Sequence, residues 1–380
     1  MITCIKSNRM IFPEGVRPGC VYLQGSKILQ VDGAHCCDQV LDFGDNFVSP
    51  GFIDLHTHGA QGYYFSNCTV EEAEKICAFH MGHGTTTLLP TTSAAPFEQM
   101  EAAVGVLAKY MDMGTCPISV PGIHMEGPYL SLKQAGAMRP SYITPPKEED
   151  YVPFLEKYGK YIARVTYAPE NDAQQKFTKA LVQHGILPSV GHSDAAYEEL
   201  LPAFEAGCTL VTHLYSCTST ITRTQGFRHL GIIETAYLLD GMDIELITDG
   251  KHLPHELLRM IFKCKDHKHI ALITDSISAT GLEITESNAA NIPYIIEDGV
   301  CKLPDRSAFA GSIATTDVLL RNAVQAGCTV KDAVSMMTAV PARIMKLPKG
   351  RLETGLDADI TVFDDSFTVK AVFAMGKQVV

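Results

Sequence analysis

The sequence predicts an α/β fold, namely a (β/α)8 TIM barrel with a small β-sandwich domain formed by both chain ends. The main observation is a series of eight short apolar or β-branched runs between residues 51 and 345. Continuous runs of this kind are typical of parallel strands that are buried on both faces. The eight strand candidates are Phe52–Leu55, Thr85–Leu89, Ile118–Ile123, Ala163–Tyr167, Leu187–Val190, Thr209–Thr212, Ile244–Ile247 and Ala271–Ile273.

Helix-like segments fill the gaps between these runs. Glu71–His80 and Pro254–Lys263, for example, carry apolar residues at helical spacing. Eight βα units in roughly 250 to 300 residues are what a (β/α)8 barrel requires. A doubly wound open sheet is the alternative, but no glycine-rich dinucleotide fingerprint follows the first strand.

Both ends of the chain differ from this middle part, because their strand-like pieces are short and broken by glycine and proline. These pieces are Gly19–Leu23, Lys27–Val31, Asp359–Phe363 and Val369–Met375. Neither end could bury a core alone, so we expect residues 1–49 and 346–380 to form one small β-domain. Residues 50–345 would form the barrel, with Ile292–Leu303 as a hairpin inserted after the eighth strand.

Composition narrows the class of protein. A formal net charge of −12 argues against nucleic-acid binding, which needs a basic surface, although local arginines could still hold a small anion. No run of 18 apolar residues supports a transmembrane helix, and the first residues lack the apolar core of a signal peptide. Twelve cysteines follow no regular framework, which is typical of reduced thiols. We therefore expect a cytoplasmic protein without a membrane partner.

The stretch that ends the first predicted strand carries two histidines, His56 and His58, followed at once by a glycine. On an extended strand, side chains at i and i+2 point to the same face. The two imidazoles can therefore converge on one point, and imidazole is the commonest neutral metal ligand in proteins. A second pair of this kind, His267 and His269, lies in a lysine-rich stretch and is interpreted as a surface feature.

Other predicted strands also end in groups that can bind metals or transfer protons. In a (β/α)8 barrel the catalytic groups come from the carboxyl ends of several strands. Residues at these positions are Glu126 after strand three, His192 after strand five, His213 after strand six, His252 after strand seven and Asp275 after strand eight. One buried histidine is more often a hydrogen-bonded core residue, but so many ionisable groups at one rim are hard to explain as packing.

This set of groups fits hydrolysis. Histidines and a carboxylate suit a divalent metal, Zn²⁺ first, with Fe, Co or Mn as alternatives. Such an ion lowers the pKa of a bound water towards neutrality, and a carboxylate beside it, here Asp275, can take the proton and pass it to the leaving group. The alternative role for Asp275 is a helix N-cap. His252 would assist or bind substrate.

Five motifs in this order resemble the amidohydrolase superfamily and, within it, the family of N-acetylglucosamine-6-phosphate deacetylases. They are Pro-Gly-Phe-Ile-Asp-Leu-His-x-His-Gly (50–59), His-Met-Glu-Gly-Pro (124–128), Gly-His-Ser (191–193), Thr-His-Leu-Tyr (212–215) and Thr-Asp-Ser (274–276). The resemblance extends over nearly the whole chain, including a return to a β-sandwich after Gly350. The second motif is the most specific, because many relatives use a carboxylated lysine from strand four instead of Glu126.

The resemblance implies a role for each of these residues. Glu126, His192 and His213 would hold one metal ion, and His56 and His58 would form a second site bridged by Glu126. Asp275 matches the general base of the family and His252 its substrate-binding histidine. Ala310, Gly311 and Ser312 match the segment that lines the sugar pocket. The resemblance also implies a homodimer in which an arginine from the neighbouring subunit reaches the substrate phosphate.

Several substrate-contact positions depart from the family pattern. Ser216 and Cys217 stand where an Asn-Ala pair touches phosphate, and Met138 stands where a histidine contacts substrate. Methionine cannot donate the hydrogen bond that such a histidine would make. The expected arginine is absent at Thr224, so Arg228 and Arg223 are rival candidates.

We therefore expect metal-dependent deacetylation of N-acetylglucosamine 6-phosphate to glucosamine 6-phosphate and acetate. The alternatives are a related amidohydrolase that acts on another N-acyl amino sugar, an N-acyl amino acid or a cyclic amide, or a catalytically silent binding protein. The silent protein would have lost Asp275 or a ligand, and this sequence has lost neither.

Overall fold

A barrel of eight parallel strands forms the body of the molecule. The computed structural model describes residues 1–289 and 292–380. The barrel strands are β6 (Phe52–Thr57), β9 (Thr85–Ser93), β10 (Ile123–Glu126), β11 (Ile162–Tyr167), β12 (Leu187–Val190), β13 (Leu210–Val211), β16 (Asp243–Ile247) and β17 (Ile270–Ile273). Each lies within or overlaps one of the predicted strands.

The strands follow one another around the barrel in chain order, from β6 to β17, and all pairs are parallel. The first and last meet where Thr57 bridges Ser276 and the Asp275 amide donates to the His56 carbonyl (2.9 Å). All carboxyl ends therefore lie at one end of the barrel. The predicted fold class is confirmed.

The third strand begins later than predicted, at Ile123 instead of Ile118. Pro117 and Pro121 have no N–H to donate to a strand ladder. Only Ser119 of the preceding segment bridges a strand, to Thr87 of β9. The shift places Glu126 as the last residue of β10, at the rim of the barrel.

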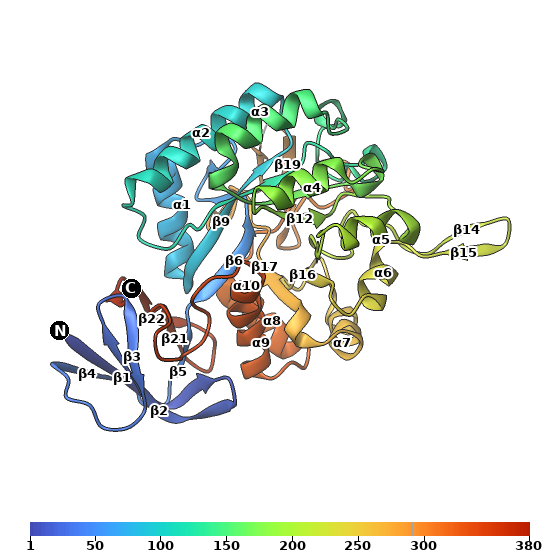
Figure 1. The fold of residues 1–380 in the computed structure, drawn as a ribbon. Helices are drawn as coiled ribbons and strands as arrows, with labels where there is room; N and C mark the ends of the chain where they lie inside the picture. The colour runs from blue at the N-terminus through green and yellow to red at the C-terminus, as the bar shows by residue number, and fades with distance from the viewer. Residues whose placement is uncertain (290–291) are drawn as a thin grey trace.

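Helices surround the barrel (Figure 1). They are α1 (Val70–Gly82), α2 (Phe97–Met113), α3 (Glu148–Tyr158), α4 (Lys176–Gln183), α5 (Tyr197–Glu205), α6 (Ile232–Leu238), α7 (His255–Cys264), α8 (Thr316–Gln325), α9 (Val330–Met337) and α10 (Ala339–Ile344), with short 3₁₀ turns at Leu132–Gln134, Pro140–Tyr142, Gly159–Tyr161, Pro169–Asn171 and His267–His269. Local sequence sets their ends. Thr69, for example, starts α1 with a capping box, in which its hydroxyl accepts from the Glu72 amide and Glu72 accepts from the Thr69 amide. No helix in 1–289 or 292–380 is long and apolar enough to cross a bilayer.

Both chain ends join a second sheet beside the barrel, as predicted (Figure 1). Its strands are β1 (Ile2–Phe12), β2 (Gly15–Gln24), β3 (Lys27–Val31), β4 (Gln39–Asp42), β5 (Phe47–Pro50), β21 (Ile360–Phe363), β22 (Val369–Ala374) and β23 (Lys377–Gln378). β1 pairs with β4 along its first half and with β5 along its second, so the sheet branches. Residues from both ends, among them Ile5, Val48 and Ile360, share one buried cluster.

Three small antiparallel sheets connect the main elements. β7 (Gly59–Ala60) pairs with β8 (Tyr63–Tyr64), and β14 (Thr222–Thr224) pairs with β15 (Phe227–His229) in a hairpin that projects from the body of the molecule (Figure 1). The predicted hairpin after the eighth strand, Ile292–Leu303, forms β19 (Ile292–Glu297) and β20 (Val300–Lys302). A further strand that was not predicted, β18 (Glu286–Ala289), pairs with β19.

Candidate metal centre

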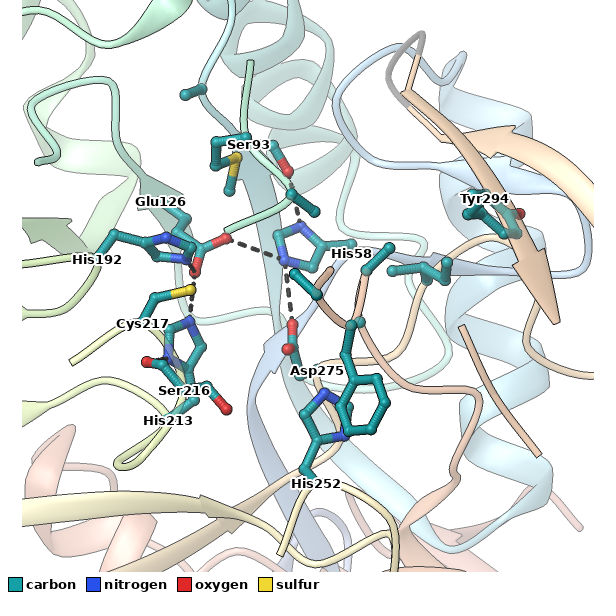
Figure 2. A pocket seen from close by; sticks show the side chains of 18 of the residues that line it. His58, Ser93, Glu126, His192, His213, Ser216, Cys217, His252, Asp275 and Tyr294 are labelled. Atoms are coloured by element: carbon teal, nitrogen blue, oxygen red, sulfur yellow. Dashed lines mark hydrogen bonds and ion pairs between the residues drawn. The ribbon is translucent and has the colours of Figure 1, made fainter. Parts of the chain in front are cut away.

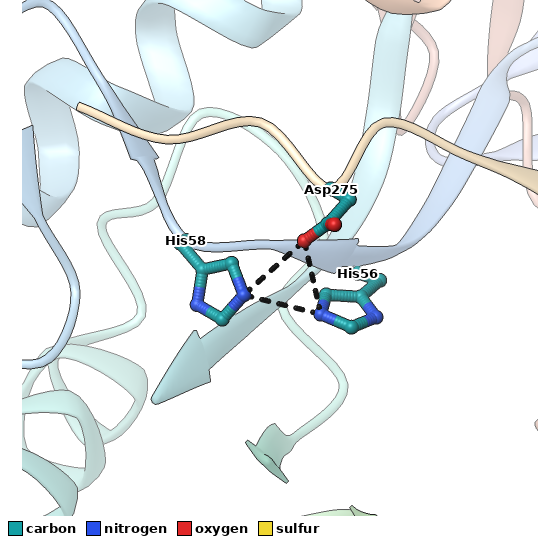
Figure 3. Close-up of side chains that lie close together, drawn as sticks. All are labelled: His56, His58 and Asp275. Atoms are coloured by element: carbon teal, nitrogen blue, oxygen red, sulfur yellow. Dashed lines mark hydrogen bonds and ion pairs between the residues drawn. The ribbon is translucent and has the colours of Figure 1, made fainter. Parts of the chain in front are cut away.

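Two imidazoles from the end of β6 meet a carboxylate from the end of β17. His56 Nε2 lies 3.2 Å from His58 Nε2, and Asp275 Oδ1 lies 3.4 Å and 3.3 Å from these two atoms. All three side chains are buried and point toward one another (Figure 3). The two-residue repeat of an extended chain places both imidazoles on one side. The structure thus brings together three residues that the sequence places at two strand ends.

Glu126 lies at the centre of four imidazoles. Its Oε1 is 2.8 Å from His213 Nε2, 3.2 Å from His192 Nε2 and 3.6 Å from His56 Nε2, and its Oε2 is 3.2 Å from His58 Nε2. Burial by itself raises the pKa of Glu126, but the imidazoles outweigh it and hold this pKa well below the usual value. One carboxylate therefore contacts both pairs of histidines. Figure 2 shows Glu126 between His58 on one side and His192 and His213 on the other.

The contacts of Nδ1 in His192 and His213 indicate the protonation of Nε2, the ring nitrogen that faces Glu126. His192 Nδ1 lies 2.9 Å from the Gln134 carbonyl and His213 Nδ1 lies 3.1 Å from the Ser216 carbonyl. A carbonyl only accepts, so Nδ1 of each ring carries the proton. If the ring is neutral, Nε2 has a lone pair that points toward the Glu126 carboxylate. Two acceptors, Nε2 and a carboxylate oxygen, then face each other, and they are stable together only with a second ring proton or a cation between them. Neutral imidazoles with carboxylates are a donor set that fits a divalent metal such as Zn²⁺.

Three residues of this cluster have left-handed backbone conformations that residues other than glycine rarely adopt. The φ angles are 46° at His192, 29° at His213 and 48° at Asp275. Each such residue costs about 1–3 kcal/mol, and such residues cluster at functional sites. Each of the three is the second residue after the end of a barrel strand, β12, β13 or β17, where the chain turns at the rim of the barrel.

A buried ion pair supports the cluster from inside the barrel. Arg164 of β11 pairs with Glu245 of β16, and both side chains are fully buried. Glu245 Oε2 lies 3.6 Å from His56 Nδ1, on the side of the ring away from Glu126. Burial by itself raises the pKa of Glu245, but Arg164 outweighs it and holds this pKa at about 2. Sequence reasoning missed this pair, although a charged residue within each of two apolar runs was a visible signal.

A cavity of about 300 Å³ opens over the cluster (Figure 2). It is lined by His58, Glu126, His192, His213 and Asp275, and by six of the predicted substrate-contact residues, Met138, Ser216, Cys217, His252, Ala310 and Gly311. Sequence reasoning missed the remaining lining residues, among them Tyr64, Ser93, Ile277, Tyr294 and Phe309. Within 1–289 and 292–380, the lining residues include neither arginine nor lysine.

The histidine after the seventh strand is held by its own loop. Asp249 Oδ2 lies 2.8 Å from His252 Nδ1, and Asp249 Oδ1 accepts from the His252 amide (2.8 Å). Phe309 packs edge-on against the ring, with 4.8 Å between ring centroids. The contact at Nδ1 leaves Nε2 as the ring nitrogen available to a ligand in the cavity.

Tyr64 and Ser93 orient His58. Ser93 Oγ lies 3.2 Å from His58 Nδ1 and 2.6 Å from the Tyr64 hydroxyl, and the Tyr64 ring stacks on the His58 ring with 5.6 Å between centroids. A contact to the outer nitrogen of a metal-binding histidine fixes the orientation of the ring. The sequence offers no spacing signal for this chain of contacts, because its members come from separate segments.

Three of the predicted substrate-contact residues lie outside the cavity. Ser312 is buried and its hydroxyl donates to the Thr274 carbonyl (2.5 Å), so it supports the loop that carries Asp275. Arg223 and Arg228 are exposed on the projecting hairpin, and Arg228 Nη1 donates to the Gly226 carbonyl (3.0 Å). Neither arginine lines the cavity of its own chain.

The chain is similar in sequence to described enzymes. Residues 47–379 match the profile of the amidohydrolase family. The chain is 30% identical to N-acetylglucosamine-6-phosphate deacetylase from Lysinibacillus sphaericus, over 94% of this chain and 92% of that protein. It is also 30% identical to N-acetylgalactosamine-6-phosphate deacetylase from Shewanella sp. (strain ANA-3), over 86% of this chain and 82% of that protein.

A solved structure is also similar to this chain over its whole length. An Asp-to-Ala mutant of N-acetyl-D-glucosamine-6-phosphate deacetylase from Mycobacterium smegmatis, in complex with N-acetyl-D-glucosamine-6-phosphate, superposes with a TM-score of 0.92. It is 29% identical to this chain and the match covers 100% of this chain and 99% of that one.

Proposed function

The chain belongs to the amidohydrolase family, and from this premise we propose that it is a metal-dependent deacetylase of N-acetylglucosamine 6-phosphate. The products are glucosamine 6-phosphate and acetate. The observation that carries the proposal is Glu126 among four histidines, with Asp275 facing two of them at the floor of a cavity. The experiment that tests it measures the release of acetate and free amine from this substrate by the purified protein. The activity should be lost when a chelator removes the metal and should recover when Zn²⁺ is added.

The proposed metal ligands are Glu126, His192 and His213 for one ion and His56 and His58 for a second, with Glu126 shared. Zn²⁺ is the first choice, and Fe, Co or Mn would suit the same donors. A bound ion supplies Lewis-acid polarisation of the substrate carbonyl and lowers the pKa of water at the site.

The other steps fall to residues of the chain. Asp275 Oδ1 faces His56 and His58, so its carboxylate lies beside the place where water would attack. Asp275 takes a proton as the water oxygen bonds to the acetyl carbon, and returns it to the amine nitrogen as the C–N bond breaks. His252, held at Nδ1 by Asp249, presents Nε2 to the substrate.

We propose that the group that binds the phosphate comes from a second copy of the chain. The cavity lining described above contains no arginine or lysine, while Arg223 and Arg228 lie on a projecting hairpin. The same hairpin region exposes 73% of Phe227 and 49% of Ile221, and exposed apolar residues grouped in this way are typical of interfaces. A homodimer in which this hairpin reaches the partner's cavity accounts for both observations.

Arg228 and Arg223 are each replaced with alanine. In the variant that lacks the phosphate-binding arginine, KM is expected to rise about 10-fold to 100-fold with kcat little changed. A hydrogen bond to a charged group contributes about 1.5–3 kcal/mol, and the lost contact binds substrate and transition state alike. Steady-state kinetics on both variants, with Arg321→Ala as a control on a partly exposed arginine of α8, gives the measurement.

Mixed dimers decide from which subunit the arginine comes. In a dimer of one Asp275→Asn chain and one chain with the arginine replaced, only the second cavity keeps Asp275. If the arginine acts across the interface, this cavity receives it from the first chain and KM returns to the value of the unmodified enzyme. A KM that stays high would contradict binding across the interface.

A second candidate function rests on the chemistry of the cavity itself. Met138, Ile277 and Phe309 give it apolar walls, and no cation of the same chain, within the described ranges, lines it. An unphosphorylated N-acyl amino sugar, an N-acyl amino acid or a cyclic amide would suit such walls. A panel that pairs each phosphorylated N-acyl sugar with its unphosphorylated form separates the two, because the first proposal requires higher kcat/KM for the phosphorylated member.

Metal binding to the metal-free protein is expected to release protons. Burial by itself lowers the pKa of His56 and of His58, but Glu126 and Asp275 outweigh it and raise both values to about 9. Below about pH 9 the metal-free rings are therefore protonated, and each must lose its proton to become a ligand. Affinity should increase as pH rises from 6 to about 9 and then level off.

Calorimetry in buffers of different ionisation enthalpy counts the released protons, with the chelator alone as the control. An affinity that does not change with pH would show that the rings are neutral before the metal binds, and would contradict this prediction.

We also assign residues 1–49 and 346–380 to a small β-domain and residues 50–345 to the metal-dependent catalytic barrel. The cluster of Ile5, Val48 and Ile360 supports the division, because it is separate from the cluster inside the barrel. A cytoplasmic location is proposed on the chemistry of the thiols, since all twelve cysteines are free.

A further inference from the structure

A second cluster of metal-binding side chains lies away from the cavity. His267, in the short turn before β17, faces Cys328 and Asp332, which flank the start of α9. One donor atom from each of the three lies within 4.8 Å of the others. Asp275 follows the carboxyl end of β17, whereas His267 precedes its amino end. The second cluster therefore lies at the end of the barrel opposite the cavity.

The orientation of His267 is that of a metal ligand. Its Nε2 lies 3.2 Å from the Phe262 carbonyl, which only accepts, so the ring proton is on Nε2. Nδ1 then turns a lone pair toward Asp332 Oδ2, 3.7 Å away. Histidine ligands commonly donate their other N–H to a backbone carbonyl in this way. Two acceptors that face each other beside a thiol need a proton or a cation between them.

The spacing of the donors fits an ion of the size of Zn²⁺. Tetrahedral sites with bonds of about 2.0–2.3 Å separate their donor atoms by about 3.3–3.8 Å. The 3.7 Å between His267 Nδ1 and Asp332 Oδ2 lies within this range. Lys331 Nζ contacts the other oxygen of Asp332, Oδ1, at 3.4 Å. Oδ2 accepts from the Thr329 hydroxyl (2.8 Å), and its second lone pair is the one that would face the cluster.

Burial and charge agree with this interpretation. Cys328 is 7% exposed, whereas the side chains of His267 and Asp332 are 31% and 29% exposed. A metal could therefore enter from solvent and keep a water as its fourth ligand, while the thiol side of the site stays dry. When a bound metal has displaced the thiol proton, thiolate and carboxylate together carry two negative charges, which balance a divalent ion.

We propose that His267, Cys328 and Asp332 form a structural site for a borderline-soft divalent metal, Zn²⁺ first. The site joins the turn before β17 to the turn between α8 and α9, and so closes a long loop of the chain. A metal that binds only the folded state stabilises it. This proposal is independent of the proposed function, because none of the three residues lines the cavity.

Cobalt substitution gives a signal that the proposed catalytic ligands cannot produce, because none of them is a thiolate. The full-length protein loaded with Co²⁺ is expected to show a thiolate-to-cobalt charge-transfer band in the near ultraviolet. The band should disappear in Cys328→Ser and should weaken or shift in His267→Gln, whose partly exposed side chain can be changed with little risk to folding. Zn²⁺ should raise the Tm of the metal-free unmodified protein more than that of Cys328→Ser.

Two other cysteines supply matched controls. Cys264 is an exposed thiol at the end of α7, close in sequence to His267, and Cys217 is the thiol in the cavity. The band is expected to persist in Cys264→Ser and in Cys217→Ser. Absence of the band from the unmodified protein, or its persistence in Cys328→Ser, would overturn the proposal. So would its loss only in Cys217→Ser, since that places the thiolate ligand in the cavity.

Discussion

Replacing Asp275 with asparagine is expected to lower kcat by about 10²–10⁴-fold while the protein keeps its metal. Asparagine fills the same space but cannot accept a proton at neutral pH. Burial by itself raises the pKa of Asp275, but His56 and His58 outweigh it and hold this pKa at about 2, so the group is an ionised base in the unmodified protein. The contacts of Glu126 with the histidines do not involve Asp275, so the metal ligands remain in place.

Kinetics and metal content together decide the role of Asp275. Its Oδ1 is close enough to His56 and His58 to hold an ion with them, which is the main rival interpretation. A ligand role predicts that the asparagine variant loses metal, and a proton-transfer role predicts that it loses only turnover. Asp317→Asn is a matched control, since Asp317 also contacts a histidine, His83, but lies on α8. Normal turnover in Asp275→Asn would contradict either role.

The strand ends are what the sequence predicted best. Buried parallel strands form continuous apolar runs, so the residue after each run is easily located, and Glu126, His192, His213 and Asp275 all follow such runs. Their convergence is then a property of the barrel and needs no information about side chains. The largest error in a strand start, at Ile118, arose because β-branched residues between two prolines imitate a strand. At the other end of a strand, β9 continues to Ser93, beyond the predicted end at Leu89.

Contacts between side chains of distant segments could not be predicted in the same way. Ser93 and Tyr64 reach His58 through rotamers and loop positions that no spacing rule encodes. Glu245 was placed in a strand, but its pairing with Arg164 depends on which face of each strand points into the barrel. The arginines were chosen from a family motif and from their position in the chain, and both lie on the β14–β15 hairpin and do not line the cavity of their own subunit.

The neighbours of the second His-x-His pair, His267 and His269, could not be predicted from the sequence either. His267 and His269 precede β17 in a 3₁₀ turn, where i and i+2 side chains do not share a face. His269 Nδ1 lies 2.7 Å from Asp243 Oδ1, whereas His267 faces the start of α9. The pair does not converge as His56 and His58 do, and only the fold shows that one member has Cys328 and Asp332 as neighbours.

Replacing Glu126 with glutamine is expected to remove every metal ion from the cavity and to lower kcat/KM by at least about 10³-fold. Glu126 is the only carboxylate that contacts all four rings among the residues the structure describes, at 2.8 to 3.6 Å. A neutral amide supplies neither the charge that balances a divalent ion nor two equivalent oxygens. Metal content, measured by elemental analysis of protein prepared without chelators, gives the result.

The number of ions lost separates a two-metal centre from a one-metal centre. If Glu126 bridges two ions, metal content should fall by two per chain in Glu126→Gln and by one in His58→Asn, because His192 and His213 keep the other ion. If the centre holds one ion, His58→Asn should leave the content unchanged. Glu170→Gln is the matched control, since Glu170 follows β11, is largely buried, and bonds Ser193 instead of a histidine. Equal metal content in Glu126→Gln and in the unmodified protein would contradict both arrangements, because each makes Glu126 a ligand of the ion that His192 and His213 hold.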